Sequence, residues 1–157
     1  VAVGIGTTLL LHSDLVYAAP DARFRLPFAN LGLCPEFASS YLLPRIAGRV
    51  KAAEWLLLGE FFSAEDARSA GLINAIDDDP YALARAQAVK LAQQAPGALR
   101  EAKALMRDHP PREVLDAVLQ KEFEAFSQRL SGPEFAEAVA AFFEKRPADF
   151  SSFKLNP

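Results

Sequence analysis

The sequence lacks most of the features that mark disulfide-linked, metal-binding or membrane-spanning proteins. Cys34 is the one cysteine in 157 residues, so no disulfide can form within the chain, and we expect a reducing, cytoplasmic compartment. The two histidines, His12 and His109, lie far apart and accompany no cysteine cluster, so the sequence shows no ligand spacing for a structural zinc ion. The longest apolar run at the start, residues 1–11, is too short and too rich in glycine and threonine to cross a bilayer.

The sequence also has little excess charge. Its 17 Lys and Arg residues are offset by 20 Asp and Glu residues, which gives a formal net charge of −3. This balance gives no reason to expect a nucleic acid or an anionic membrane as partner. A chain of 157 residues with 51% hydrophobic and 24% charged residues is typical of one globular domain. Because it opens on valine in the middle of an alternating pattern, VAVGIG, we expect it to be part of a longer protein.

The first residues predict a strand that ends in a glycine turn. Gly4 and Gly6 follow alternating apolar and small residues, and residues 7–12 continue as a short apolar helix. Such a turn lets a ligand approach the backbone and directs N–H groups toward a negative charge, although tight packing alone can also require it. The third glycine of a dinucleotide fingerprint and the Lys-Ser/Thr of a phosphate loop are absent from this turn, which disfavours both nucleotide-binding motifs.

The rest of the chain predicts short strands followed by a helical half. Strands are expected at residues 14–19, 22–26 and 72–76. Glycine, proline and capping signals predict helices at residues 50–58, 63–71, 81–94, 97–107, 112–129 and 133–144. The helix over residues 112–129 has an apolar stripe, which is usual for a face packed on the core but would also suit a lid over a ligand or a neighbouring subunit. The stripe comprises Val114, Leu115, Val118, Leu119, Glu122, Phe123 and Phe126.

Glu36 is the candidate catalytic residue. It follows Pro35 where an irregular Gly/Pro loop turns into an apolar helix, and Pro44 either bends that helix or begins another. N–H groups at a helix start favour an anion, while apolar neighbours partly desolvate it, a combination that suits a general base. The alternative is that Glu36 is only one of the acidic residues common in a first helical turn.

Four blocks of the sequence, in order and spacing, resemble the crotonase superfamily of enoyl-CoA hydratases and isomerases. They are VAVGIGTTLLLHSDLVYA, ARFRLPFANLGLCPEFASSYLLPRIAG, AAEWLLLGEFFSAEDARSAGLIN and FAEAVAAFFEKRPADF. The resemblance implies an α/β fold, in which a spiral of ββα turns precedes a helical region that docks subunits into trimers or hexamers. It covers the second half of that pattern only, so we expect the N-terminal half of the protein to lie outside this sequence. Residues 1–78 are expected to form the last turns of the spiral core, and residues 79–157 a helical region for oligomerisation and CoA cover.

The resemblance also implies the chemistry. It places one of two oxyanion donors on the backbone N–H of Ile5, beside Gly6, and the other donor in the missing half. Hydratases of the family use two glutamates, whose positions are occupied here by Thr8 and Phe28, and neither residue can act as a base. The block around Glu36 instead resembles delta-3,delta-2-enoyl-CoA isomerases, in which one glutamate takes the C2 proton of a 3-enoyl-CoA and returns it at C4.

Other implications concern the acyl pocket, the CoA moiety and the partners. Phe37 stands where the family usually has glycine, so its ring is expected to narrow or close the acyl pocket. Phe126 and Lys145 match positions that contact the adenine and a phosphate of CoA, although a core stripe and a helix-terminal cation explain them equally well. We expect an acyl-CoA substrate, no prosthetic group or metal, no nucleic acid or membrane partner, and a homotrimer or hexamer. An acyl-CoA-binding protein without turnover and a hydratase with displaced carboxylates are the alternatives.

Overall fold

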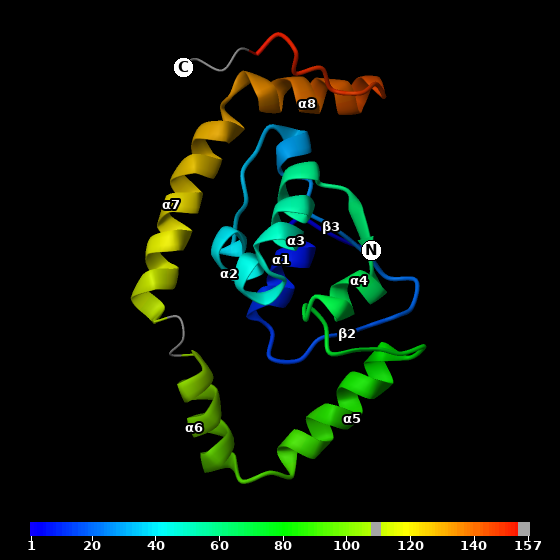
Figure 1. Ribbon diagram of the computed structural model, residues 1–157, viewed down its shortest axis with the longest axis vertical. Helices are drawn as coiled ribbons and strands as arrows, with labels where there is room; N and C mark the ends of the chain where they lie inside the picture. The colour runs from blue at the N-terminus through cyan, green and yellow to red at the C-terminus, as the bar shows by residue number, and fades with distance from the viewer. Residues whose placement is uncertain (108–110, 154–157) are drawn as a thin grey trace.

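The computed structural model describes residues 1–107 and 111–153 (Figure 1). It has an α/β architecture, as predicted, with short strands at the centre and long helices in the second half of the chain. His109 and the tail after residue 153 lie outside the described residues. Within the described residues, no helix is both long and apolar enough to cross a membrane.

Two small sheets form the centre of the molecule. In the first, β1 (Ala2–Val3) pairs in parallel with β3 (Arg23–Arg25), and β3 pairs antiparallel with β4 (Phe61–Ser63). In the second, β2 (Tyr17–Ala18) pairs in parallel with β5 (Ala75–Ile76). The strands are shorter than predicted because pairing holds only two or three residues of each apolar run in register.

The hydrophobic core lies between the first sheet and the helices that follow it. Trp55 and Phe62 stack face to face with ring centroids 3.9 Å apart, and Phe62 also stacks on Phe24. All three are at most 5% exposed, so these rings belong to the core. Burying such rings removes a large apolar area from water and dominates the energetics of a core.

The helices of the first half are short, and glycine and capping signals fix some of their boundaries. They are α1 (Ile5–Thr8), the 3-10 helices η1 (Leu9–His12) and η2 (Ala29–Leu31), α2 (Ser39–Ile46), α3 (Arg49–Ala53), the π-helical turn η3 (Glu54–Leu58) and α4 (Ala64–Ser69). Gly59 ends η3 at φ 60°, where a Cβ atom would lie 1.8 Å from the side-chain oxygen of Asn30, so only glycine fits. Ser63 and Asp66 form the capping box of α4, and the hydrogen bonds from Ser63 lower the pKa of Asp66.

Four longer helices form the second half: α5 (Pro80–Ala92), α6 (Pro96–Arg107), α7 (Arg112–Leu130) and α8 (Pro133–Glu144). In Figure 1, α7 runs along one side of the central elements, α8 crosses one end, and α5 and α6 extend from the other end. Of the alternatives for the apolar stripe on α7, packing on the core accounts for Phe126, whereas Phe123 is 68% exposed. The division at residue 78 and the oligomerisation role of residues 79–157 stay predictions.

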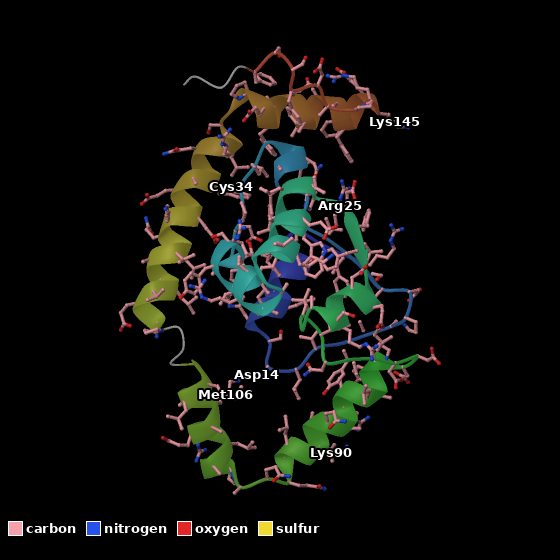
Figure 2. The ribbon with its side chains drawn as sticks, in the orientation of Figure 1. Asp14, Arg25, Cys34, Lys90, Met106 and Lys145 are labelled. Carbon is pink, nitrogen blue, oxygen red and sulfur yellow. The ribbon has the colours of Figure 1, made fainter. Side chains whose placement is uncertain are left out.

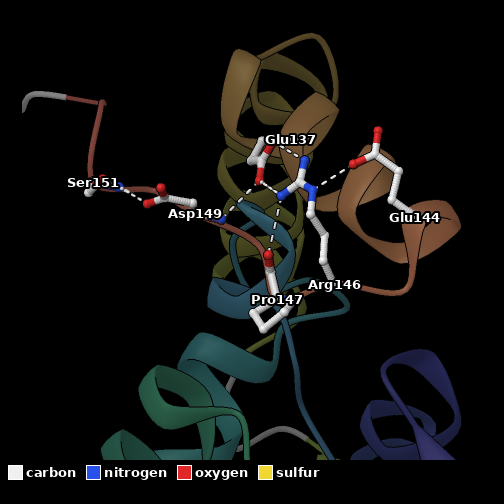
Figure 3. A network of polar contacts seen from close by, with 6 residues as sticks. All are labelled: Glu137, Glu144, Arg146, Pro147, Asp149 and Ser151. Atoms are coloured by element: carbon white, nitrogen blue, oxygen red, sulfur yellow. Dashed lines mark hydrogen bonds and ion pairs between the residues drawn. The ribbon is translucent and has the colours of Figure 1, made fainter.

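The end of α8 is fixed by a network of charged groups (Figure 3). The guanidinium of Arg146 bonds both carboxylate oxygens of Glu137, and its Nε donates to Glu144 at 2.6 Å. The backbone N–H of Asp149 also donates to Glu137, at 2.9 Å. Arg146 and this N–H together lower the pKa of Glu137 to about 2.

Candidate active site

A cavity of about 710 Å³ opens between the glycine turn, the segment from residue 27 to 37 and one face of α7. Most of its lining is apolar, and Glu36 and Glu122 are the two carboxylates among the described lining residues. The lining consists of Val3, Gly4, Ile5, Pro27, Phe28, Leu31, Leu33, Glu36, Phe37, Leu119, Glu122, Phe123, Phe126, Ser127 and Leu130. An apolar cavity with few polar groups is the usual form of a small-molecule site.

The glycine turn contributes main-chain donors to one wall. Gly4 has φ 55° and ψ −121°, a conformation that glycine adopts without strain, and its N–H donates to Arg25 O at 2.9 Å. The next two N–H groups, of Ile5 and Gly6, are the first two of α1, and the helix itself provides no acceptors for them. Gly4 and Ile5 line the cavity, whereas Gly6 lies beside them in the turn. Within α1 the N–H groups of Ile5 and Gly6 therefore have no acceptor, and their role as oxyanion donors stays a prediction.

The Glu36 carboxylate is oriented by Thr8. The Thr8 hydroxyl donates to Glu36 Oε1 at 2.7 Å, and Thr8 itself is fully buried. Among residues 1–107 and 111–153, the other oxygen, Oε2, has no hydrogen-bond partner. Glu36 lines the cavity and is half-buried, so one oxygen is held by the protein and the other remains available to a ligand. In the sequence, Thr8 was notable only because hydratases of the family have a glutamate at its position, and its contact with Glu36 was not predicted.

The backbone around Glu36, which we name the base turn (residues 36–40), is held in an unusual conformation. Phe37 and Ala38 both have φ 58°, in the left-handed region that costs a residue other than glycine roughly 1–2 kcal/mol. The N–H and hydroxyl of Ser39 donate to Glu36 O at 3.1 and 2.6 Å. His12 Nε2 lies 2.8 Å from Phe37 O, so this nitrogen must carry the proton to donate. Several contacts therefore oppose relaxation of the base turn.

Glu122 of α7 supplies the contact that sequence reasoning missed. Its carboxylate accepts hydrogen bonds from Ala38 N at 2.6 Å, from Ser40 N at 3.0 Å and from the Ser40 hydroxyl at 2.5 Å. These main-chain donors form the start of α2, which begins at Ser39 and not at Glu36. The expectation that Glu36 is the anion at this helix start is therefore wrong, because Glu122 takes that place. The one available signal was a single acid within an apolar stripe.

The remaining predicted site residues do not all meet at the cavity. Phe126 lines it and also packs against the core. Lys145 lies at the far end of α8 and is not among the lining residues (Figure 2). The Phe37 ring packs on the His12 ring, with centroids 4.3 Å apart, and lines a cavity that it does not close; that Phe37 narrows the acyl pocket stays a prediction. Burial raises the pKa of the Cys34 thiol, in keeping with a small apolar side chain beside the loop.

Comparison with known proteins gives the family. Residues 1–153 match the family described as enoyl-CoA hydratase/isomerase. The chain is 39% identical over 155 residues to 1,2-epoxyphenylacetyl-CoA isomerase of Escherichia coli K12, covering 96% of this chain and 58% of that protein. It is 35% identical over 148 residues to enoyl-CoA delta isomerase 2 of Rattus norvegicus, covering 93% of this chain and 38% of that protein. Hydratases match at comparable identity, such as 35% over 152 residues for 2,3-dehydroadipyl-CoA hydratase of E. coli K12, covering 95% of this chain and 59% of that protein.

A solved structure agrees with the sequence comparisons. The crystal structure of an enoyl-CoA hydratase/isomerase from Pseudoalteromonas atlantica T6c superposes with a TM-score of 0.91 and 42% identity. The match covers 96% of this chain and 61% of that one, so the chain spans about three fifths of the length of this relative. Fold, sequence and cavity thus lead to one conclusion: the chain belongs to the enoyl-CoA hydratase/isomerase family.

Proposed function

We propose that the protein is an enoyl-CoA isomerase that moves the double bond of a 3-enoyl-CoA to the 2 position. The observation that carries the proposal is the Glu36 carboxylate, which lies in an apolar cavity with one oxygen bonded to Thr8 and the other without a protein partner among the described residues. The relatives include enoyl-CoA delta isomerase 2, 1,2-epoxyphenylacetyl-CoA isomerase and a hydratase, so the preference for an isomerase rests on the geometry of the site.

The proposed reaction needs one base. Glu36 removes a proton from C2 of the thioester, and the electrons spread over a dienolate whose oxygen accepts from the N–H of Ile5. The protonated Glu36 then returns the same proton at C4, so no water or cofactor is consumed. One carboxylate serves both steps because C2 and C4 are in the plane of the dienolate, and a carboxylate over one face of that plane can reach both carbons. A positioned base of this kind contributes typically about 10²–10⁴ in rate.

The second carboxylate of the cavity does not support water addition. A hydratase of this family would need a second acid or base to orient the water, and Glu122 is the candidate by position. Both of its oxygens are occupied by hydrogen bonds from the start of α2. Thr8 and Phe28 cannot replace it, because neither side chain titrates near neutral pH. These contacts favour isomerisation over the hydratase alternative.

The rest of the substrate site is proposed by family likeness. A CoA thioester would place its acyl chain against Phe37, while Phe126 would lie near the adenine and Lys145 near a phosphate of a CoA bound to this or a neighbouring subunit. We further propose that the second oxyanion donor comes from residues outside this chain. The chain spans 58% of the first relative and 38% of the second, which leaves room for that donor.

The Glu36→Gln substitution in the complete gene product tests the proposal. With a 3-enoyl-CoA substrate, we expect the formation of 2-enoyl-CoA to fall by about 10²–10⁴, because the amide cannot accept the proton. Conversion is followed by the absorbance of the conjugated thioester, and Glu60→Gln, an exposed position outside the cavity, is the matched control. An unchanged rate in Glu36→Gln, or 3-hydroxyacyl-CoA as the main product from a 2-enoyl substrate, would overturn the isomerase assignment. Binding of the thioester without any product would favour the non-catalytic alternative.

A further inference from the structure

We propose that Glu122 is a positioning residue that holds the base turn, and with it Glu36, in the geometry needed for proton transfer. The inference rests on the proposed role of Glu36 and goes beyond it, because it gives α7 a part in the reaction. Glu122 is 8% exposed and lies on α7, in the cavity wall formed with Leu119 and Phe126.

The burial of Glu122 requires a specific set of partners. A carboxylate removed from water without hydrogen bonds costs far more than a helix can compensate. Glu122 receives three hydrogen bonds, and all of them come from Ala38 and Ser40, which are 84 and 82 residues away in the sequence. The carboxylate is therefore matched to one short segment, the one that follows Glu36.

The base turn has no local substitute for this contact. Ala38 is the N-cap of α2 and has no side chain that can cap it, and the Ser39 hydroxyl is directed back to Glu36 O. Without Glu122 the N–H groups of Ala38 and Ser40 would lose their acceptor, and the contact that opposes relaxation of the strained Phe37 and Ala38 backbone would be lost. Glu122 of α7 therefore supplies the hydrogen-bond acceptor that the sequence next to α2 lacks.

Glu122 acts through Glu36 and not on the substrate. Oε2 accepts from Ala38 N, and Oε1 accepts from both donors of Ser40, which leaves the carboxylate engaged on both oxygens. Glu36, two residues before Ala38, has its own oxygen held by Thr8. A shift of the base turn would therefore move the Glu36 backbone relative to Thr8, and misplacement of a reacting group by about 1 Å can cost 10²-fold in rate.

The Glu122→Gln substitution in the complete gene product tests the inference by two readouts. The amide nitrogen of glutamine cannot accept a hydrogen bond, so a main-chain donor of α2 loses its partner while size is kept. We expect kcat to fall about 10–100-fold with KM changed less than about 3-fold. We also expect hydrogen exchange at the amides of Ala38 and Ser40 to be at least about 10-fold faster, with the amides of α7 unchanged.

Two further variants sharpen the test. Glu124→Gln is the same substitution at an exposed position of the same helix and should change neither readout. Ser40→Ala removes one of the three donors at an exposed position, should leave the fold intact, and should lower kcat by a smaller factor, about 2–5-fold.

The inference is overturned if Glu122→Gln keeps kcat within twofold of the wild type or leaves exchange at Ala38 and Ser40 unchanged. Loss of protection throughout α7 would also overturn it, because Glu122 would then only stabilise the helix. If Glu122→Gln fails to fold, Ser40→Ala decides: an unchanged kcat together with unchanged hydrogen exchange at the Ser40 amide would overturn the inference. A wild-type rate in Glu36→Gln is a separate result, which rejects the isomerase mechanism and leaves the anchoring of the base turn to be judged by exchange alone.

Discussion

At the scale of single residues, Thr7 and Thr8 are neighbours with the same side chain and different partners. Thr7 is 1% exposed and donates to Ala2 O at 2.8 Å, which ties α1 to β1. Thr8 is fully buried and donates to the carboxylate of Glu36 at 2.7 Å. The first contact stabilises the fold, and the second orients the proposed base.

This difference predicts opposite effects of the same substitution. Thr8→Val should lower kcat for 3-enoyl-CoA isomerisation about tenfold with little loss of stability, because the half-buried Glu36 can exchange Thr8 for water. Thr7→Val should lower the free energy of unfolding by about 1–2 kcal/mol, since it leaves the Ala2 carbonyl without its partner, and should leave kcat near the wild-type value. Urea denaturation and steady-state kinetics of both variants measure the two effects. Equal kinetics in the two variants would show that Thr8 does not orient Glu36.

The sequence identified some residues of the cavity and missed others. Glu36, Ile5 and Phe126 all line the cavity, because each is positioned by a nearby turn or by the periodicity of its own helix, and their roles stay predictions. Glu122 could not be assigned in this way, since its partners lie 82–84 residues earlier and no local pattern connects them. Its position among apolar residues was visible, but the reason for an acid there depends on tertiary structure.

At the scale of elements, local signals defined helices better than strands. The capping box at Ser63 begins α4 and the glycine at position 59 ends η3 where predicted, because both signals act within one turn. The strand expected at residues 72–76 is reduced to Ala75–Ile76, since its extent depends on pairing with β2, far away in the sequence. Likewise, the single helix expected at residues 50–58 is α3 followed by a π-helical turn.

The network at the end of α8 predicts a local acid transition. The pKa of Glu137 is lowered to about 2 in the folded protein from an ordinary value of 4.5, so its stabilising contribution is complete above about pH 4.5. That contribution is lost as the pH falls from about 4.5 toward 2, and Asp149 N and Arg146 lose their partner. We expect the Asp149 amide to exchange faster over this interval, while Glu137→Gln removes the pH dependence at this position. Equal pH profiles in the two proteins would contradict the assignment.

At the scale of the whole molecule, the helical half exposes large apolar side chains. Phe142 and Phe143 of α8 are each 76% exposed, and Leu105 and Met106 of α6 are 63% and 73% exposed. Exposed groups of this size on helices mark surfaces that another chain or segment covers. We propose that they contribute to the trimer or hexamer expected from the family likeness.

Assembly can be tested on the complete gene product. Sedimentation at micromolar concentration should give a mass of three or six subunits. The double substitution Phe142→Asp and Phe143→Asp should weaken association at least about tenfold, because it places charge where apolar area is buried. Gln128→Asp, which adds a charge at an exposed polar position of α7, is the control. A monomeric wild-type protein, or assembly that the double substitution does not change, would contradict the proposal.

The separation of 84 residues between Ala38 and Glu122 also has a consequence for synthesis. A ribosome synthesises Glu36 well before it makes Glu122, so until α7 is present the N–H groups of Ala38 and Ser40 lack the acceptor that holds the base turn. The catalytic geometry is then among the last parts of the fold to be completed. A chain that stops before α7 would contain Glu36 but not the Glu122 contacts that position the base turn.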